Sequence, residues 1–344
     1  MKVLVAERIG PAHAAVACRI REEPPAPGAG RVLVGMLAMP VNPADLLLVE
    51  GHYGVRRDPP FVPGHEGVGR VLQVGPGVDT LSPGDLVVPL STACWTERMV
   101  IPASAAIRLP AGVDLLQASM LKANPATAWA LLHGVVTLAP GDWVIQNAGN
   151  SAVGTFLNAQ AARAGLRTVS LVRRPDAVPA EPARHGSAFV VDAGADPAAV
   201  RDAIGAATGG APIRLALDAV GGAATQRLGS VVADGAPVVS YGLLSGEPCR
   251  LDAHDTVFRD VSLRGFWLPR WLEAAGAARI ASLYAELAAL LADRRLHAPV
   301  AACHRLDDVA RALARAADGG RDGKVVFVTD ASGLAAAPFE PVEP

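Results

Sequence analysis

The sequence predicts an α/β protein of two domains, one rich in β-strands and one built on a doubly wound parallel sheet. Over roughly the first 110 residues, short apolar runs are separated by Gly and Pro, which is typical of short strands joined by turns. From residue 143 onward, strand-like and helix-like segments alternate, which is typical of a parallel sheet covered by helices on both faces. The length of 344 residues also exceeds the size at which a single core usually stops growing.

The elements expected in the β-rich domain are short. Strands are predicted over residues 3–5, 31–35, 67–75 and 85–89, and the Pro83-Gly84 pair marks a turn before the last of them. Between residues 115 and 136 the apolar positions take a helical spacing that only Pro125 interrupts. One or two helices are therefore expected to connect this domain to the next.

The second domain begins with a predicted strand at 143–146 and a helix at 155–164. Further strands are expected at 168–172, 188–191, 215–218, 237–241 and 260–268. A long Ala/Leu-rich helix is predicted over 272–291, and residues 323–329 form a short strand that can return to the first domain.

Composition and charge exclude several classes of function. A formal net charge of −2 gives no reason to expect nucleic acid or an anionic membrane as partner. The N-terminus mixes charges among its first eight residues, and no stretch approaches about 18 uninterrupted apolar residues, so neither an export signal nor a membrane span is expected. The four cysteines are scattered and form no C-x-x-C pair, which favours a reducing cytoplasm.

The strongest functional signal is the turn Gly149-Asn-Ser-Ala-Val-Gly154 between a predicted strand and a predicted helix. Its glycines let the backbone approach a pyrophosphate, and the following helix points free N–H groups at the phosphate charge. Ser151 stands where the common G-x-G-x-x-G pattern has its middle glycine. The turn therefore predicts a dinucleotide site.

The next strand ends in Arg173-Arg174, where an NAD-specific site would place an acidic residue for the ribose 2′-hydroxyl. Two guanidinium groups suit a 2′-phosphate, whose oxygens arginine can contact in bidentate fashion. NADPH is therefore the expected cofactor. The alternative is that the two arginines are the solvated end of a loop.

Several phrases resemble the medium-chain dehydrogenase/reductase superfamily. They are Val41-Asn-Pro-Ala-Asp45, Gly64-His-Glu-Gly-Val-Gly69, Leu121-Lys-Ala-Asn-Pro-Ala-Thr-Ala128 and the run from Gly141 to Gly154. Gly51-His-Tyr-Gly54 and the phrase from Phe258 to Leu268 narrow the resemblance to zinc-independent 2-enoyl thioester reductases of the mitochondrial fatty-acid type. The resemblance implies a GroES-like catalytic domain over 1–120 and 298–344, and a Rossmann NADPH-binding domain over 121–297.

Zinc enzymes of the same superfamily carry a ligand motif that Gly64-His65-Glu66 resembles. Here Asn42 stands where such enzymes have their first cysteine, and Asn124 lies near the position of the last ligand. Amides are poor zinc ligands, and a site needs about three protein side chains. We therefore expect no metal, and we expect His65 to be a hydrogen-bonded structural residue.

The resemblance implies the reduction of a trans-2-enoyl thioester carried on CoA or an acyl-carrier protein. Hydride from NADPH adds to the β-carbon, and Tyr53 gives its proton to the α-carbon, since a phenol with a pKa of about 10 is protonated at neutral pH. Asn124 is the second implied catalytic residue, near the nicotinamide or Tyr53. From the residues alone, Tyr53 can equally be a loop aromatic, and Asn124 the start of a helix.

The resemblance also implies which residues contact the cofactor. The pyrophosphate would be contacted by Asn150, Ser151, Ala152 and Val153, and the 2′-phosphate by Arg173 and Arg174. The nicotinamide and its ribose would be surrounded by Asn124, Tyr241, Gly242, Leu243, Leu244, Phe266, Trp267 and Leu268. NADP would also be contacted by Lys324. From the residues alone, Lys324 would be a surface lysine and Trp267 a core or interface residue. A homodimer joined through the edge strand near 261–267 is the implied assembly.

Three alternatives remain at this point. The chain can be a zinc-free reductase of quinones or other α,β-unsaturated carbonyls, which would share every cofactor residue. It can be a non-catalytic protein that binds NADPH for sensing or stability. A zinc alcohol dehydrogenase is the third alternative, and stoichiometric zinc in the purified protein would favour it.

Overall fold

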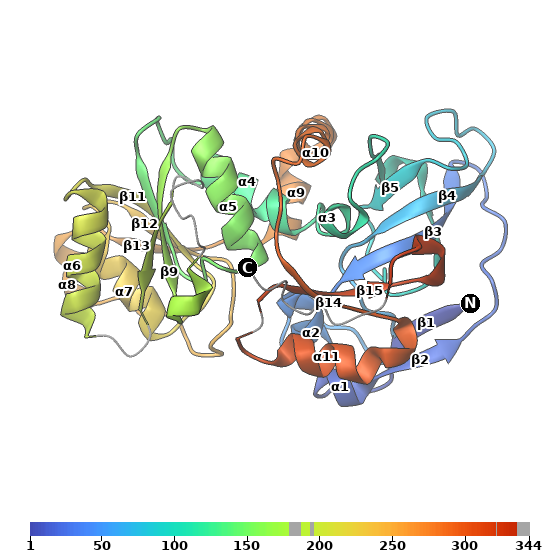
Figure 1. Cartoon of the computed structure of the whole chain (residues 1–344), viewed down its shortest axis with the longest axis horizontal. Helices are drawn as coiled ribbons and strands as arrows, with labels where there is room; N and C mark the ends of the chain where they lie inside the picture. Colours follow the sequence, from blue (N-terminus) through green and yellow to red (C-terminus); the bar gives the residue numbers. More distant parts are fainter. Residues whose placement is uncertain (179–186, 193–195, 321, 336–344) are drawn as a thin grey trace. The chain divides into compact units, whose positions relative to one another are not determined.

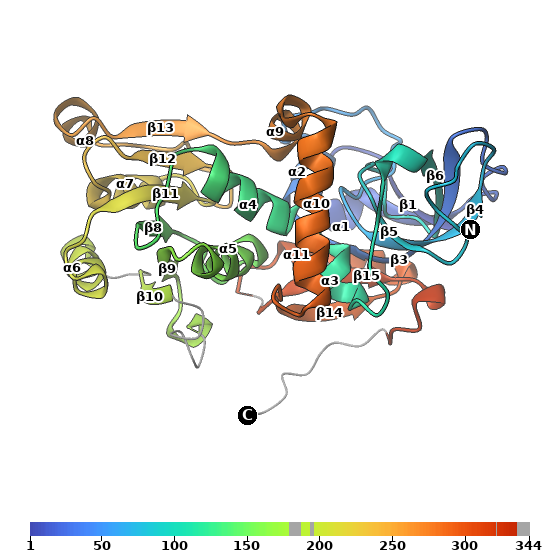
Figure 2. The same ribbon diagram turned by 90° about the horizontal axis from the view of Figure 1, so that it is seen from above.

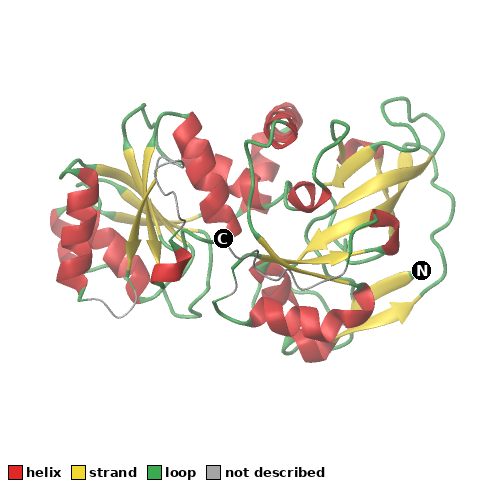
Figure 3. Cartoon of the chain, viewed as in Figure 1, coloured by secondary structure: helices red, strands yellow, loops and turns green. Residues whose placement is uncertain are grey.

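The computed structural model describes residues 1–178, 187–192, 196–320 and 322–335, shown in Figures 1 and 3. The chain forms two compact units, Met1–Asn124 with Ala277–Pro344, and Pro125–Gly276. The chain thus returns to the first unit at Ala277, before the predicted boundary at 297. The reason is that α10 (Ala277–Ala292) packs on α3 (Leu115–Ser119) and β7 (Ala106–Arg108), which both belong to the first unit.

The first unit is organised by a seven-stranded sheet of order β14-β15-β3-β4-β5-β7, with β6 also paired to β3. Its further strands are β3 (Arg31–Pro40), β4 (Val68–Val74), β5 (Leu86–Pro89), β6 (Arg98–Pro102), β14 (Val300–His304) and β15 (Lys324–Val328). The predicted return of the C-terminal strand is present, since β15 pairs antiparallel with β3 and places Val326 opposite Pro40. This pairing joins the C-terminal part of the first unit to its N-terminal part in one sheet.

The remaining elements of the first unit cover this sheet. They are β1 (Lys2–Ala6), β2 (Val16–Ile20), α1 (Ala12–Ala15), α2 (Pro43–Val49) and α11 (Val309–Ala317), with short 3₁₀ turns at Ala103–Ala105, Leu306–Asp308 and Asp330–Ser332. In Figure 1, α11 lies beside α1 and α2, and these helices contact one another. Leu4, Met36, Trp95 and Phe327 are fully buried in the shared core. Burial of such side chains is the main stabilising contribution to this unit.

The second unit contains a six-stranded sheet of order β10-β9-β8-β11-β12-β13, in which every neighbouring pair is parallel. The strands are β8 (Trp143–Gln146), β9 (Arg167–Val172), β10 (Ser187–Val191), β11 (Ile213–Asp218), β12 (Pro237–Ser240) and β13 (Ser262–Gly265). Figure 2 shows this order along the sheet. From β8 the chain adds β9 and β10 toward one edge of the sheet, and from β11 it adds β12 and β13 toward the other edge. The order of the strands therefore reverses between β8 and β11, and ligands bind in such sheets at the carboxyl ends of the two strands at this switch point. The predicted doubly wound sheet is confirmed.

Helices α5 to α8 of the second unit lie between its parallel strands in the sequence, while α4 precedes the first strand and α9 follows the last. Their bounds are α4 (Asn124–Gly134), α5 (Ala152–Arg163), α6 (Pro197–Thr208), α7 (Ala223–Val231), α8 (Ala253–Phe258) and α9 (Leu268–Ala275), with a 3₁₀ turn at Pro175–Ala177. The prediction of one helix over 272–291 is wrong, because Gly276 adopts a φ of 76° and separates α9 from α10. Within the described residues, no single helix is long and apolar enough to cross a membrane, and only the bent α9–α10 pair passes that test by length and composition.

Candidate active site

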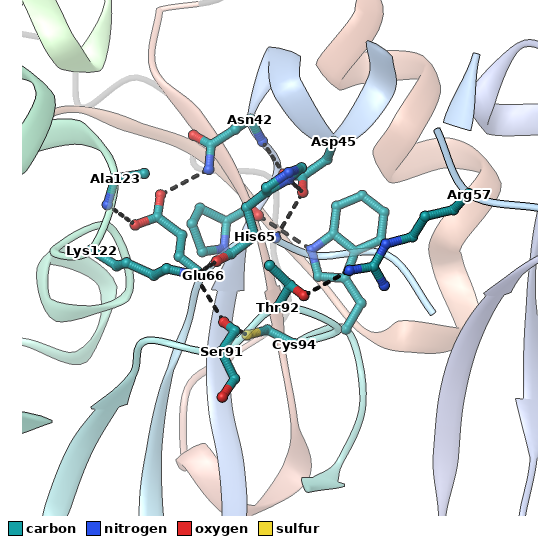
Figure 4. A network of polar contacts seen from close by, with 12 residues as sticks. Asn42, Asp45, Arg57, His65, Glu66, Ser91, Thr92, Cys94, Lys122 and Ala123 are labelled. Atoms are coloured by element: carbon teal, nitrogen blue, oxygen red, sulfur yellow. Dashed lines mark hydrogen bonds and ion pairs between the residues drawn. The ribbon is translucent and has the colours of Figure 1, made fainter. Parts of the chain in front are cut away.

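A buried polar cluster lies in the first unit, and Figure 4 shows two of its members, Asn42 and Glu66, with the residues around them. The segment around the start of α2 supplies Asn42, the turn before β4 supplies Glu66, and the start of α4 supplies Asn124. Lys324 opens β15 and reaches Asn42 because β15 runs beside the end of β3, where Val41 N–H bonds Val325 O at 2.9 Å. We call Asn42, Glu66, Asn124 and Lys324 the Glu66 cluster.

Glu66 is fully buried and every oxygen of its carboxylate accepts a hydrogen bond. Its Oε1 accepts from the amides of Asn42 at 2.8 Å and Asn124 at 2.7 Å, and its Oε2 accepts from Ala123 N–H at 2.7 Å. The Lys324 ammonium donates to the amide oxygens of the same two asparagines, at 2.7 and 3.3 Å. Two amides therefore connect a buried carboxylate to a buried ammonium.

The burial of Glu66 dominates its ionisation. Loss of solvation raises the pKa of Glu66 to about 7, although the Asn42 hydrogen bond and the Lys324 charge act in the opposite direction. The described residues of the cluster thus include a carboxyl group that can exist in either protonation state near neutral pH.

Lys122 joins the loops around this cluster. Its ammonium donates to His65 O at 2.5 Å and to Ser91 O at 2.8 Å, while its own carbonyl accepts from the Tyr284 hydroxyl at 2.8 Å. Burial lowers the pKa of Lys122. Burial also raises the pKa of the nearby Cys94 thiol to about 12, so Cys94 is not a thiolate nucleophile at neutral pH.

Tyr53 lies in the loop that follows α2. Gly51 has a φ of 77°, which favours glycine, and Tyr53 N–H then bonds Leu47 O at 3.1 Å. The half-buried Tyr53 ring meets the His65 ring edge-to-face, with centroids 5.0 Å apart and planes at 69°. As expected, His65 is hydrogen bonded: its Nδ1 lies 2.6 Å from Asp45 Oδ1.

The donor set of the Glu66 cluster does not suit zinc. The amide oxygens of Asn42 and Asn124 already accept from the Lys324 ammonium, which would repel a second cation. Within the described ranges, no group of three or more His, Cys, Asp or Glu side chains is placed to hold a metal ion. A catalytic zinc needs about three such ligands.

The glycine-bracketed turn in the second unit connects β8 to α5. Ser151 is the N-cap of α5, and its Oγ accepts from Gly154 N–H at 3.1 Å. A Cβ added to Gly149 would lie 2.5 Å from Ser170 Cβ, and one added to Gly154 would lie 2.7 Å from Gly149 O. The two glycines are therefore required by close packing, and the turn leaves the N-terminus of a twelve-residue helix at the carboxyl edge of the sheet.

The other residues predicted to contact a cofactor within this unit follow the carboxyl ends of neighbouring strands. Arg173 is exposed directly after β9, and Arg174 Nε forms an ion pair with Asp176 at 3.0 Å. Tyr241 follows β12, its hydroxyl is buried, and no hydrogen bond of good geometry satisfies it among the described residues. Phe266 follows β13, and its N–H bonds Ser240 O at 2.8 Å. These positions, with half-exposed Leu243 and Leu244, fit a dinucleotide at this edge.

Comparisons with known proteins identify the family of this chain. The model of the alcohol dehydrogenase GroES-like domain matches residues 28–111, and that of the zinc-binding dehydrogenase domain matches residues 185–327. The mitochondrial enoyl-[acyl-carrier-protein] reductase of Homo sapiens is 36% identical over 291 residues, which cover 82% of this chain and 76% of the human protein. The chain belongs to the enoyl reductases of the medium-chain dehydrogenase/reductase superfamily.

Solved structures extend this comparison to the whole enoyl reductase fold. A protein assigned as an NADPH:quinone reductase from Bacillus thuringiensis matches with a TM-score of 0.85 and 25% identity, over 95% of this chain and 98% of that one. The complex of Etr1p with NADP and crotonyl-CoA matches with a TM-score of 0.84 and 22% identity, over 95% and 99% of the two chains. At 22% identity, the match to Etr1p shows that the two chains share a fold.

One prediction about this enoyl reductase is contradicted by the same comparisons. A cytoplasmic location was expected from the scattered cysteines and the charged N-terminus. The curated relatives at this level of similarity are instead named mitochondrial proteins. Cysteine usage reports a reducing environment, and that property does not distinguish one reducing compartment from another.

The sequence alone did not indicate the structural roles of some residues at the switch point and in the Glu66 cluster. Asp218, at the end of β11, accepts from Asn147 Nδ2 at 2.6 Å and from Gly221 N–H at 3.0 Å, so it fixes the loop beside the switch point. The available signal was an acidic residue ending an apolar strand before Gly221-Gly222. Lys324 was expected on the surface from its residue type alone, whereas the structure leaves it only 7% exposed.

Proposed function

We propose that this enoyl reductase uses NADPH to reduce the C=C bond of a trans-2-enoyl thioester carried on CoA or an acyl-carrier protein. The observation that carries the proposal is the similarity to enoyl-[acyl-carrier-protein] reductases over most of the chain, together with a tyrosine in the Gly51–Gly54 loop. NADPH, when bound, supplies the hydride for the β-carbon. The protein must then hold the cofactor, orient the thioester and deliver a proton to the α-carbon.

The second unit would hold the cofactor mainly through the negative charges of its phosphate groups. The N-terminus of α5, with Asn150, Ser151, Ala152 and Val153, binds the pyrophosphate through free N–H groups and the helix dipole. Arg173 and Arg174 would bind the 2′-phosphate, and Arg174 would then exchange its ion pair with Asp176 for the phosphate. Residues after β12 and β13 surround the nicotinamide ribose and ring: Tyr241, Gly242, Leu243, Leu244, Phe266, Trp267 and Leu268.

Tyr53 is the proton donor in this proposal. Negative charge that reaches the thioester oxygen after hydride addition makes the α-carbon basic, and a neutral phenol is a suitable acid for it. Asn124 and Lys324 act from the Glu66 cluster, where the amide and the ammonium are held by hydrogen bonds and can orient polar groups of the cofactor or substrate. We expect no metal to take part, because conjugation spreads the charge of the added hydride onto the thioester oxygen and the cluster already contains its own cation.

The assembly we propose is a homodimer joined through β13. This strand is the edge of its sheet, and Leu263 on it is 42% exposed. The neighbouring helix α8 exposes Val257 and Phe258 at 69% and 76%. An exposed edge strand with exposed apolar side chains on it and on the neighbouring helix is a ready surface for pairing with a second copy. Sedimentation of the wild type and a Leu263→Lys variant would test it, since the variant should become monomeric.

The function is tested by following NADPH absorbance while a short trans-2-enoyl-CoA is added in the presence of a zinc chelator. Rapid oxidation that Tyr53→Phe slows about 10²-fold or more supports the proposal. A small quinone is the parallel acceptor, because the Bacillus thuringiensis neighbour is assigned to that activity. Oxidation by the quinone alone, unchanged in Tyr53→Phe, would replace the proposal with quinone reduction.

A further inference from the structure

His65 lies between a fully buried carboxylate and the tyrosine proposed as proton donor. Asp45 is 0% exposed, and its Oδ1 contacts both the Nδ1 of His65, at 2.6 Å, and the backbone N–H of His65, at 2.8 Å. Lys122 holds the carbonyl of the same residue at 2.5 Å. The imidazole therefore has a fixed orientation, and its Nε2 is the nitrogen left for other partners.

The imidazole is also placed for proton exchange with water. Its side chain is 15% exposed, whereas Asp45 is sealed from solvent. The titratable groups around it come from every neighbouring segment: Asp45 from α2, Tyr53 from the loop after α2, Cys94 from the loop before β6, and Lys122 from the segment after α3. Glu66, the next residue along the chain, bonds away from His65 to Asn42, Asn124 and Ala123.

We propose that His65, oriented by Asp45, positions Tyr53 and returns a proton to it after each reduction. This inference rests on the proposed function of Tyr53. The Tyr53 hydroxyl gives its proton to the α-carbon and becomes a phenolate. Protonated His65 then transfers the proton on Nε2 to that phenolate oxygen and becomes neutral, with Nδ1–H still donated to Asp45. A proton from water restores the imidazolium, so that no other reactant is needed.

The geometry explains why a histidine suits this place. A ring that meets Tyr53 edge-to-face at 5.0 Å restricts the phenol to one orientation, which a flexible side chain would not do. A carboxylate on Nδ1 fixes the tautomer and stabilises the imidazolium that carries the proton, as in other histidine–carboxylate pairs. His65 is therefore a positioning residue, since it acts on the substrate only through Tyr53.

The kinetic test compares His65→Phe with His52→Phe. Phenylalanine at position 65 keeps an aromatic edge against Tyr53 but cannot carry a proton, and His52 is an exposed histidine next to Tyr53 in the same loop. We expect His65→Phe to lower kcat at least tenfold with little change in KM, and to alter the pH profile of kcat. In a Tyr53→Phe background the same substitution should cost nothing further. An unchanged kcat and pH profile, or an equal loss in both backgrounds, would overturn the proposal.

A second measurement needs no turnover. Nuclear magnetic resonance of the protein with ¹⁵N-labelled histidine follows the His65 ring, identified by the signal that His65→Phe removes. If Nε2 exchanges its proton with the Tyr53 hydroxyl, Tyr53→Phe, which removes only that hydroxyl, changes the ¹⁵N chemical shift of His65 Nε2 and leaves the shifts of His52 in place. A chemical shift of Nε2 that does not change refutes the coupling. If the His65 signal changes on Tyr53→Phe as expected but the wild type reduces no enoyl thioester, only the proposed function is contradicted.

Discussion

Replacing Glu66 by Gln tests the ionisation of the buried cluster directly. Burial raises the pKa of this carboxyl group from 4.5 to about 7. A group whose pKa is higher in the folded than in the unfolded state contributes its full stability below the unfolded pKa, and loses it as pH rises through the folded pKa. At about 1.4 kcal/mol for each pH unit, the interval from 4.5 to 7 corresponds to about 3 kcal/mol.

We therefore expect the free energy of unfolding of the wild type to fall by about 3 kcal/mol relative to Glu66→Gln between pH 4.5 and pH 7, and to run parallel to it above. Glutamine replaces one accepting oxygen by an amide N–H, which then faces the N–H donor of Ala123 or those of Asn42 and Asn124, and this adds a cost that does not vary with pH. Only the pH dependence of the difference is diagnostic.

The assay is urea denaturation at several pH values, followed by tryptophan fluorescence. Trp95, the one of the five tryptophans that belongs to the first unit, is fully buried there, so its emission changes when that unit unfolds. The control is Glu22→Gln, because Glu22 is an exposed carboxylate of the same unit. If the curves for wild type and Glu66→Gln are parallel across the whole range, Glu66 does not titrate near neutral pH in the folded state, and the reasoning from burial is wrong.

Three further predictions concern the second unit. Gly149→Ala should lower the free energy of unfolding by about 1–3 kcal/mol, since the added Cβ would lie 2.5 Å from Ser170 Cβ. Its control, Gly205→Ala in α6, should raise the free energy of unfolding by about 0.5–1 kcal/mol, because the space around that Cβ is open. Thermal unfolding measures both changes. Ser151→Ala should cost about 1 kcal/mol through the lost N-cap, by the same measurement. Replacing Arg173 and Arg174 by Ser should weaken NADPH binding at least tenfold in a fluorescence titration and leave NADH binding unchanged, and equal weakening of both would contradict their role.

The parallel sheet is the part of the fold that the sequence predicts best. Strands buried on both faces form continuous apolar runs, so β8 coincides with the predicted strand at 143–146, and β9 differs from its prediction by one residue. The break at Gly276 was not predictable, because the Ala/Leu pattern continues through it and a single glycine is tolerated in helices. Only the packing of α10 on α3 and β7 requires the chain to turn there.

The Glu66 cluster was less accessible to sequence reasoning for a different reason. Lys324 opens a strand of five residues, and an isolated lysine in that position is normally solvated. Its burial becomes reasonable only once β15 is paired with β3, because that pairing brings the ammonium to the amide oxygens of Asn42 and Asn124, and through them to Glu66. An unpaired buried ammonium would cost several kcal/mol, and so would the unpaired carboxylate. Each charge therefore depends on the other, and their joint burial follows from the strand pairing rather than from any property of either residue.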